Sequence, residues 1–427
     1  MLNIGKLSAG GECYYLDTVA SGVEDYCTGS GEAAGYWVGS ATPTLGLSGE
    51  VHANALRAVL VAADPMSGQR LTRAGHRRVP GFDMTFRAPK SVSVLYGLAD
   101  PETAGVVRDA HDRAVVAALG YLEREAGWSR RGVDGVERVR VAGLAAGFRH
   151  RSSRAGDPLL HTHLVVANLG QAADDGCWRT LDARQLYRHA KTAGYLYQAQ
   201  LRHELTVRLG VEWGPVRRGC ADLAGIHQTV LRAFSQRRQQ IVARLAERGE
   251  SSAKAAQIAT LDTRRAKDRH VDAKDLRAGW ARRAAALGLT QEHVVGLVGR
   301  ARGRGLDDTV VSSLLRELVG AGGLCAQAST FTGLDVLRAC CERLPAGATV
   351  ADVEALAATV LDPATGIAVR LVDPDRGREA TRRGDGRVPT VADAARYSTR
   401  RCWPWSSERW STLSADATLA RAWPASQ

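Results

Sequence analysis

The sequence predicts an α+β domain with a largely antiparallel sheet, and two observations carry this prediction. Strand-like and helix-like segments alternate over residues 1–230. Within this region, two apolar strand-like segments at 139–150 and 160–166 flank a polar turn at 152–158 that contains Gly156 and Asp157. This is the pattern of an antiparallel hairpin.

The other elements of residues 1–230 follow from periodicity and helix-start residues. Residues 82–87 alternate apolar and polar side chains, and the alternation is expected to resume over 91–96 after an interruption at Pro89. Asp100, Pro101 and Glu102 mark a helix start. The helix that follows has one apolar side, and His111 is expected on its surface. A second long amphipathic helix is predicted over 182–209.

Downstream of residue 230 the composition changes. Residues 231–300 are rich in Arg, Ala, Gln and Glu, which predicts a basic helical extension. Residues 301–399 predict a small helical module with helices over 330–344 and 350–361. No GxxxxGK[ST] phosphate loop occurs in the chain, so the sequence offers no route to ATP hydrolysis of that kind.

Residues 400–427 differ from the rest because their Trp and Cys residues follow neither helical nor strand periodicity. Read one nucleotide earlier, the Trp and Cys codons would encode residues that continue an amphipathic helix expected over 391–399. We therefore expect a frameshift near Arg400 that truncated a longer ancestral protein. A genuine disordered tail is the alternative, and reading the gene in the other frame tests the choice.

Composition limits the partners and the compartment. The chain of 427 residues carries a formal net charge of +12, which suits a polyanionic partner such as nucleic acid or a membrane surface. It has no apolar stretch of about 18 residues and no signal-peptide pattern, so a cytoplasmic protein without membrane insertion is expected. Its eight cysteines are scattered, as free thiols in a reducing compartment would be.

Three histidines form the most informative constellation. His161 and His163 are two residues apart in one strand and so share a face. If the turn centres between Ala155 and Gly156, paired residue numbers sum to 311 and place His150 opposite His161 on that face. Three converging imidazoles without an obvious fourth protein ligand describe an open divalent-metal site. Unrelated core or surface histidines and a structural zinc site are the alternatives.

A tyrosine cluster near the N-terminus and one aspartate supply the remaining parts. Tyr14, Tyr15 and Tyr26 are candidate nucleophiles, and a phenol needs a base or a cation to release its proton near neutral pH. Asp83 is expected to point away from its apolar neighbours, where it could accept that proton or orient a metal-bound histidine. Together these residues suit phosphodiester transesterification, in which a tyrosinate attacks phosphorus and expels the 3′ oxygen.

With these residues the chain resembles the TrwC/TraI-type conjugative relaxases, the MobF class of HUH endonucleases. The resemblance covers about residues 1–300. It rests on an ordered set of motifs: Tyr14-Tyr15 with Tyr26, the segments 35–39 and 45–49, 81–86 with 88–93, His150 with 160–168, and 194–197 through 209–213. Tyr26 is followed by Cys27, where many members carry a second tyrosine pair.

The resemblance implies a five-stranded antiparallel palm and a helical extension that clasps single-stranded DNA. It implies that Tyr14 attacks at the nic site of an origin of transfer and forms a 5′-phosphotyrosine, with Tyr15 and Tyr26 as auxiliary or second-transfer tyrosines. Asp83 would be the base or histidine orienter, and the three histidines would be the metal ligands. Residues 301–399 would be a lead-in to a missing helicase region.

The expected cofactor is a divalent metal ion, with Mg²⁺ or Mn²⁺ in use and Zn²⁺, Ni²⁺ or Co²⁺ as alternatives. The expected partners are single-stranded origin DNA, relaxosome accessory proteins and a type IV secretion coupling protein. Expected DNA contacts are Arg87, Lys90, Arg149, Arg151, Tyr36 and Trp37. Two alternatives to a relaxase stay open: a rolling-circle replication initiator, and a non-catalytic DNA-binding remnant of a truncated relaxase gene.

Overall fold

The computed structural model describes residues 2–8, 35–72, 79–132, 135, 137–249, 252, 255, 273–301, 306–372, 395–400 and 402. The chain divides into two compact units. Unit 1 comprises Met1–Gly305 with Cys341–Ala351, and unit 2 comprises Leu306–Cys340 with Asp352–Gln427. Among the described helices, none is both long enough and apolar enough to cross a membrane.

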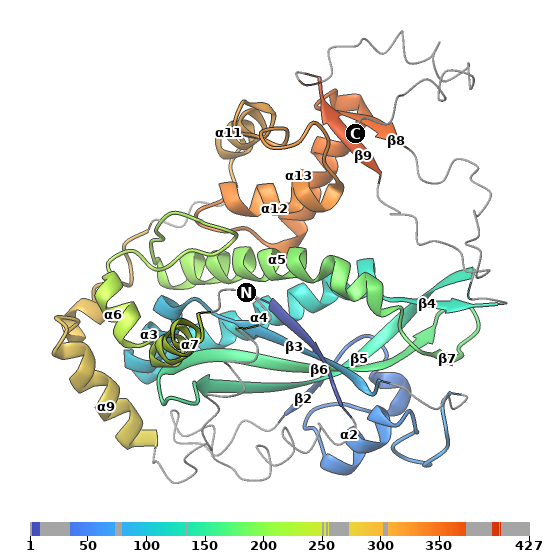
Figure 1. Cartoon of the computed structure of the whole chain (residues 1–427), viewed down its shortest axis with the longest axis horizontal. Helices are drawn as coiled ribbons and strands as arrows, with labels where there is room; N and C mark the ends of the chain where they lie inside the picture. Colours follow the sequence, from blue (N-terminus) through green and yellow to red (C-terminus); the bar gives the residue numbers. More distant parts are fainter. Residues whose placement is uncertain are drawn as a thin grey trace. The chain divides into compact units, whose positions relative to one another are not determined.

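Unit 1 is built on an antiparallel sheet. Its described strands are β1 (Leu2–Lys6), β2 (Tyr36–Val38), β3 (Gly81–Arg87), β4 (Trp128–Arg131), β5 (Glu137–Ser152), β6 (Pro158–Ala172) and β7 (Trp178–Arg179). The central order is β1-β3-β6-β5-β2, while β4 pairs with β5 and β7 with β6. The α+β prediction is therefore confirmed, and the two long strands β5 and β6 run through the middle of the sheet (Figure 1).

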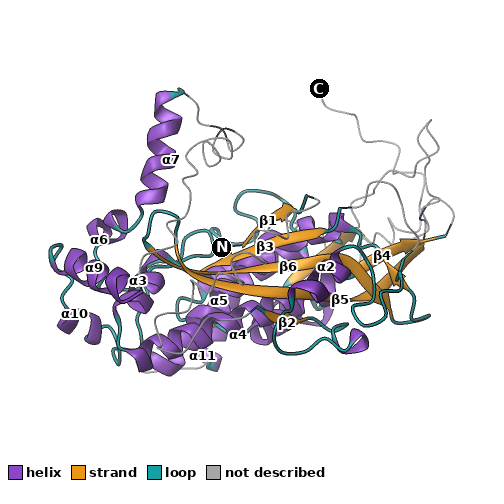
Figure 2. Cartoon of the chain, turned by 90° about the horizontal axis from the view of Figure 1, so that it is seen from below, coloured by secondary structure: helices purple, strands orange, loops and turns teal. Residues whose placement is uncertain are grey.

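Helices α4 (Pro101–Ala126) and α5 (Ala183–Leu209) cover one face of this sheet (Figure 2). Asp100 caps α4 by accepting from the backbone N–H of Thr103, and Asp182 caps α5 by accepting from that of Arg184. Alternate residues of β3 point toward these helices, so the Phe86 ring lies 5.3 Å from that of Tyr197 in α5. The sheet and both helices thereby form the main core.

The opposite face of the sheet carries a second, smaller core. Helix α2 (Ala53–Leu60) and the short 3₁₀ helix η1 (Pro43–Leu45) lie over it. Leu56 and Leu60 of α2 pack against Ala146, Phe148 and Val165 of β5 and β6. These apolar residues occupy only part of this face, which leaves the stretch near the β5–β6 turn for polar side chains.

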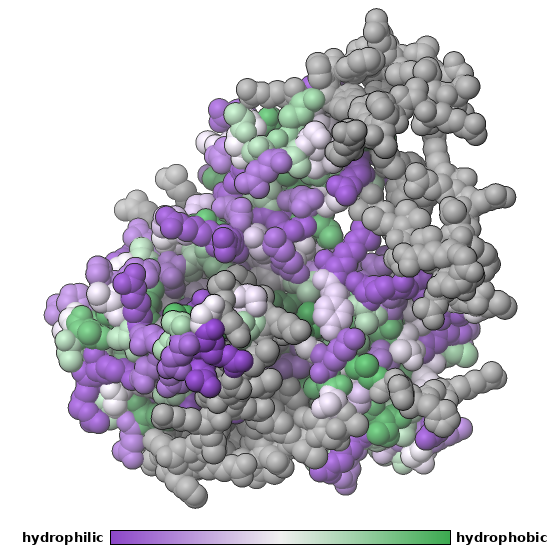
Figure 3. Space-filling view, viewed as in Figure 1, coloured by the Kyte–Doolittle hydropathy of each residue, from purple (hydrophilic) through white to green (hydrophobic). Residues whose placement is uncertain are grey.

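The helical extension belongs to the same compact unit. Its described helices are α6 (Gln228–Ala233), α7 (Gln236–Glu247), α9 (Ala273–Ala285) and α10 (Gln291–Val295). None of residues 236–247 is buried, and hydrophilic side chains gather over α7 in Figure 3. The chain is thus helical here as predicted, and α7 presents Arg237, Arg238 and Arg244 on a largely solvated helix.

Unit 2 holds a small helical module followed by a two-stranded sheet. Its elements are α11 (Asp308–Val319), α12 (Gly333–Arg343), α13 (Val350–Leu361), η3 (Pro363–Thr365), β8 (Ala368–Val372) and β9 (Arg396–Thr399), except that the last residues of α12 and the first two of α13 belong to unit 1. Both predicted helices are present. The expected helix over 391–399 is wrong where it is described, because residues 396–399 pair with β8.

Two predictions about unit 1 are also wrong. Residues 91–96 form part of helix α3 (Lys90–Leu98) rather than a strand, because Pro89 stands at the helix N-cap and α3 is buried on nearly all sides. A helix surrounded by core loses the one-sided pattern that distinguishes it from a strand. His111 is fully buried between α4, α5 and β6, not on the surface.

Candidate active site

The β5–β6 hairpin brings the three histidines together on one face of the sheet. His150 pairs directly with His161, and Phe148 pairs with His163, in the predicted register. The ring centroids of His150, His161 and His163 form a triangle with sides of 5.2, 5.2 and 5.3 Å. A β-bulge between His150 and Ser152 follows immediately. The hairpin therefore fixes all three imidazoles close to its turn.

Strand β3 places Asp83 beside this triangle. Asp83 shares a face with Thr85, which lies opposite His163 in the neighbouring strand. The His163 Nδ1–H donates to the Asp83 carboxylate at 2.9 Å, and the Thr85 hydroxyl donates to the same carboxylate at 3.3 Å. A carboxylate at Nδ1 fixes the tautomer whose lone pair is on Nε2. Asp83 is thus placed to orient a histidine.

Thr85 is a site residue that the sequence analysis missed. It is buried, and its hydroxyl also lies 3.2 Å from His163 Nδ1. The signal was available, because residues two apart in a strand share a face and Asp83 had already been placed on it.

His161 is oriented by the backbone of its own strand. Its Nδ1–H donates to the carbonyl oxygen of Leu159 at 2.8 Å, which again leaves the lone pair on Nε2. Burial lowers the pKa of His161 well below its usual value, and the neighbouring His150 and His163 add to the effect. Burial likewise lowers the pKa of His150 to about 4. Both imidazoles are therefore neutral at pH 7, as metal ligation requires.

The spacing of the rings fits one small ion. With metal–nitrogen bonds of about 2.0–2.1 Å, imidazole centroids bound tetrahedrally to one ion lie roughly 5 Å apart. The observed sides of 5.2 to 5.3 Å agree with this value. As they stand, however, no three His, Cys, Asp or Glu side chains in the described part of the chain are arranged to hold an ion. Rotations of the rings would have to turn the three donor nitrogens onto a common point.

A buried hydrogen-bond chain supports the hairpin from the opposite face. Thr162 lies between the two β6 histidines in sequence and points to the helix side, where its hydroxyl is 2.8 Å from His111 Nε2. The other ring nitrogen of His111 is 2.8 Å from the hydroxyl of Tyr197 in α5. Burial lowers the pKa of His111 to about 3, so its imidazole is neutral in this hydrogen-bond chain near pH 7. It ties the histidine strand to both long helices.

Three of the predicted DNA contacts lie on the face or at the end of the sheet that carries the histidines. Arg87 pairs with His161 across β3 and β6. Lys90 stands at the first turn of α3, where its ammonium donates to the Pro158 carbonyl at 2.8 Å and burial lowers its pKa to about 8. Trp37 pairs with Ala146 in β2 and β5, and its ring packs on the apolar cluster beneath α2.

The structure contradicts the expected placement of two others. Tyr36 and Arg149 point to the helix-covered face, opposite the histidines. A Cβ atom on Gly147 would lie 2.5 Å from the Tyr36 ring, and burial raises the pKa of its phenol. The Arg149 guanidinium forms an ion pair with Asp112 of α4. The physical reason is strand alternation, since neighbours in sequence point to opposite faces.

Arg151 follows His150 at the bulge and is buried, with 8% of its surface exposed. Tyr14, Tyr15 and Tyr26 lie outside the described residues, so their predicted roles stay predictions.

Known proteins resemble this chain over more than half of its length. A family model described as TrwC relaxase matches residues 8–287. Multifunctional conjugation protein TraI of Escherichia coli (strain K12) is 31% identical over 296 residues, which is 66% of this chain and 16% of TraI. A second TraI from Escherichia coli is 33% identical over 57% of this chain and 14% of its own length. The chain thus spans about a sixth of these relatives.

Solved structures match about two thirds of the chain. A copper-bound structure of the conjugative relaxase TrwC in complex with oriT DNA has a TM-score of 0.60 and 32% sequence identity, over 68% of this chain and 100% of that chain. A metal-free TrwC complex with oriT DNA has a TM-score of 0.59 and 33% identity over the same shares. The residues matched by the family model contain strands β2 to β7, all three histidines and Asp83, while β1 precedes them. This chain belongs to the TrwC relaxase family.

Proposed function

We propose that this chain nicks one DNA strand at an origin of transfer and rejoins it through a covalent 5′-phosphotyrosine, in plasmid conjugation or mobilisation. The observation that carries the proposal is the triangle of three imidazoles on one sheet face, with a carboxylate hydrogen-bonded to His163. Support comes from the family and from the structures of TrwC, which contain oriT DNA in complex with the relaxase.

In this proposal Tyr14 is the nucleophile, and Tyr15 and Tyr26 are auxiliary tyrosines. The phenolic oxygen of Tyr14 attacks phosphorus in line, the bond from phosphorus to the 3′ oxygen breaks, and that oxygen leaves with a proton as a 3′ hydroxyl. The phenol gives up its own proton in the same exchange, so no water is consumed. The ester linkage is kept, and the reverse step rejoins the strand.

Asp83 acts as the histidine orienter rather than as the base in this scheme. Both of its carboxylate oxygens lie within 3.0 Å of His163 Nδ1, and the Thr85 hydroxyl donates to the same group. A carboxylate engaged in this way holds the ring in one tautomer and makes the nitrogen on its far side more basic.

His150, His161 and His163 are the residues that would hold a divalent ion. The ion would supply charge to a non-bridging phosphate oxygen and so stabilise the crowded transition state at phosphorus. Imidazole donors suit Mn²⁺, Zn²⁺, Ni²⁺ and Co²⁺, and Mg²⁺ is a further candidate. Arg87, which pairs with His161 across β3 and β6, would contact a phosphate beside the site.

The DNA partner fits the charge of the chain. The net charge of +12 and the exposed basic helix α7 suit a phosphate backbone, whose binding would weaken as salt rises. Relaxosome accessory proteins and a type IV secretion coupling protein are the further partners that we propose.

The test is a denaturing gel of the full chain with labelled single-stranded DNA that carries its nic site, with Mg²⁺ or Mn²⁺. We expect a labelled band at the mass of protein plus oligonucleotide. It should be lost in Tyr14→Phe and in His161→Ala, and kept in Tyr187→Phe, a matched change at an exposed tyrosine of α5.

Other outcomes would identify a different activity. DNA that is cut without an adduct would indicate hydrolysis by water and would overturn the tyrosine step. Binding of the verified site with neither a cut nor an adduct would favour a DNA-binding remnant without turnover.

A further inference from the structure

The turn of the β5–β6 hairpin is held by the helical extension through one buried carboxylate. Asp157 is fully buried at this turn, four residues before His161. Its Oδ2 accepts from the backbone N–H of Gln236 at 2.8 Å, and its Oδ1 accepts from the Gln236 side chain at 3.1 Å and from Arg283 at 2.7 Å. Asp157, Gln236 and Arg283 together form what we call the tip clamp.

The donors of the tip clamp come from two different helices. Gln236 is the first residue of α7, so its N–H is one of the backbone groups that a helix start leaves without an internal partner. Arg283 belongs to α9, and its guanidinium also lies 4.2 Å from the centroid of the buried Phe234 ring. The carboxylate thereby links the start of α7 and one side of α9 to the hairpin.

Further contacts fix the backbone on both sides of Asp157. The indole N–H of Trp280 in α9 donates to the Gly156 carbonyl at 2.7 Å, and Lys90 donates to the Pro158 carbonyl. Within the turn, the Ser153 N–H donates to the Asp157 carbonyl at 2.8 Å, and the Asp157 N–H donates to the Ser153 hydroxyl at 3.2 Å. The whole turn is thus held from the extension and from α3.

The location of this support matters for the histidines. Asp157 and His161 are separated by roughly 13 Å of extended strand, and His150 is adjacent to the bulge on the other strand. At this end β2 no longer flanks β5, since the β2 pairing covers only residues 145–147. A shift of one residue in the register would turn His150 to the other face. Among the described strands, β6 alone pairs with β5 at this end, and the tip clamp holds the turn that joins the two.

We propose that Asp157 is a positioning residue for the three histidines, through which the helical extension holds them in the geometry that one metal ion needs. This proposal rests on the proposed function only in taking the triangle as a metal site. It adds a role for the helical extension, which would hold the hairpin turn in place in addition to carrying basic residues.

The experiment compares Asp157→Asn with Asp182→Asn in the full chain. Asp182 is a matched control because it is also a nearly buried carboxylate that caps a helix and pairs with two arginines, Arg130 and Arg184. Mn²⁺ and Co²⁺ binding is measured by calorimetry without DNA. Hydrogen exchange of residues 145–166 is measured by mass spectrometry, and Tm is recorded for each variant.

We expect Asp157→Asn to raise the dissociation constant for Mn²⁺ by about 10-fold at most, the lower limit for loss of a direct outer-shell partner, because Asp157 acts on the histidines through the turn. Exchange should become faster over residues 148–152 and 159–163. Asp182→Asn should lower Tm while leaving the metal affinity within about twofold of the parent. Arg283→Gln should reproduce the loss of affinity, and combining it with Asp157→Asn should add little, because both changes break one interaction.

Three outcomes would overturn the proposal, and they can be told apart. Faster exchange with unchanged metal affinity would reduce Asp157 to a structural residue. Equal losses of affinity in Asp157→Asn and Asp182→Asn would show a general effect of destabilisation. A parent chain that binds neither ion would remove the metal site and this inference together. A different result would contradict only the proposed function. If the parent chain binds metal but forms no adduct with DNA, and Asp157→Asn weakens the metal binding, the role of the tip clamp would still be supported.

Discussion

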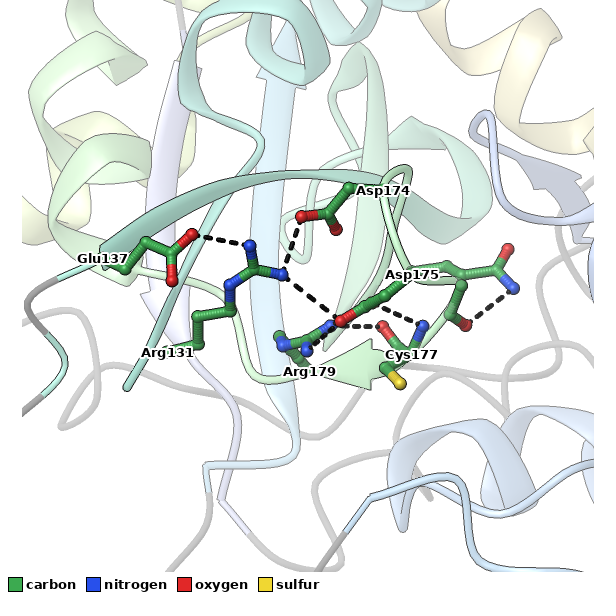
Figure 4. Close-up of polar contacts among 8 residues, drawn as sticks. Arg131, Glu137, Asp174, Asp175, Cys177 and Arg179 are labelled. Carbon is green, nitrogen blue, oxygen red and sulfur yellow. Dashed lines mark hydrogen bonds and ion pairs between the residues drawn. The ribbon is translucent and has the colours of Figure 1, made fainter. Parts of the chain in front are cut away.

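The two ends of the β5–β6 hairpin both carry arginine–carboxylate contacts, but in opposite surroundings. At the turn, Arg283 meets Asp157, whose side chain is 1% exposed. At the far end, Arg131 contacts Glu137, Asp174 and Asp175, and Arg179 also contacts Asp175 (Figure 4). We call these five residues the far-end network, and its carboxylates are 36–56% exposed.

Arginine–carboxylate pairs at the two ends therefore differ in how much stability is lost when one partner is removed. In the far-end network, water and salt replace a lost partner, so each exposed pair contributes little. A buried carboxylate that loses its arginine keeps a charge that water cannot reach, and this is strongly unfavourable. Substitutions in the buried contacts at the histidine end of the hairpin should therefore lower stability more than substitutions in the far-end network.

Acid should separate the two ends most strongly. Burial lowers the pKa of His150 to about 4 and that of His111 to about 3. In the unfolded chain both histidines have the usual pKa of about 6.5, so below that pH the unfolded chain binds more protons than the folded chain. Stability should therefore be full above pH 6.5 and fall toward pH 4, by on the order of several kcal/mol.

The far-end network should not contribute to this loss. Hydrogen bonds from Arg179 hold the pKa of Asp175 below its usual value, so this carboxylate stays ionised throughout that range. Urea unfolding of the metal-free chain at pH 7.5 and 4.5 measures the difference. A stability that is flat between these values would contradict the prediction.

Removing one arginine at each end gives the next largest contrast. Arg283→Ala should lower the free energy of unfolding by about 3 kcal/mol, because Asp157 stays buried with only the Gln236 donors. Arg131→Ala is the matched change at the far end. Chemical denaturation of both variants provides the measurement, and equal effects would show that burial does not set the difference.

A smaller effect should mark the histidine site itself. Thr85→Val removes the hydroxyl that contacts Asp83 and His163 while nearly keeping the side-chain volume. We expect metal affinity to fall several-fold, less than on loss of a full outer-shell partner. Thr103→Val, which removes a hydroxyl–carboxylate contact at the start of α4, is the control. An unchanged affinity in Thr85→Val would mean that Asp83 alone orients His163.

The smallest expected effect belongs to the far-end network. Arg131→Ala should shift Tm by no more than about 1 °C, and the shift should shrink further in high salt. Thermal unfolding at low and high ionic strength checks both statements. A large, salt-independent loss would place this network among the determinants of the hairpin and would remove the contrast between its two ends.

The sequence predicted the histidine face because local rules govern a hairpin. Strand alternation and a turn centred near Gly156 fixed the pairing of His150 with His161 without any tertiary information. The same rule, applied one residue further, would have placed Arg149 on the other face. The error at Arg149 came from reading nearness to His150 in sequence as nearness in space.

Other errors needed tertiary information to avoid. Residues 91–96 look like a strand because α3 is apolar all round, and nothing local shows that it is enclosed. The tip clamp was also out of reach, since Asp157 lies 79 residues from Gln236 and 126 residues from Arg283. No spacing rule joins a turn to helices so far downstream. His111 is different, since it falls on the apolar side of α4 with Val107, Ala114 and Val115.

That long separation has a consequence for how the protein is made. A ribosome adds about 5–20 residues per second, so Arg283 emerges on the order of ten seconds after Asp157. Hairpins close within about 1–10 μs, so the strands can pair long before the helices that hold their turn exist. During that interval the histidines are present on a nascent chain whose turn carries an unpaired aspartate. The site would thus be completed only after α9 has been synthesised and reaches the hairpin.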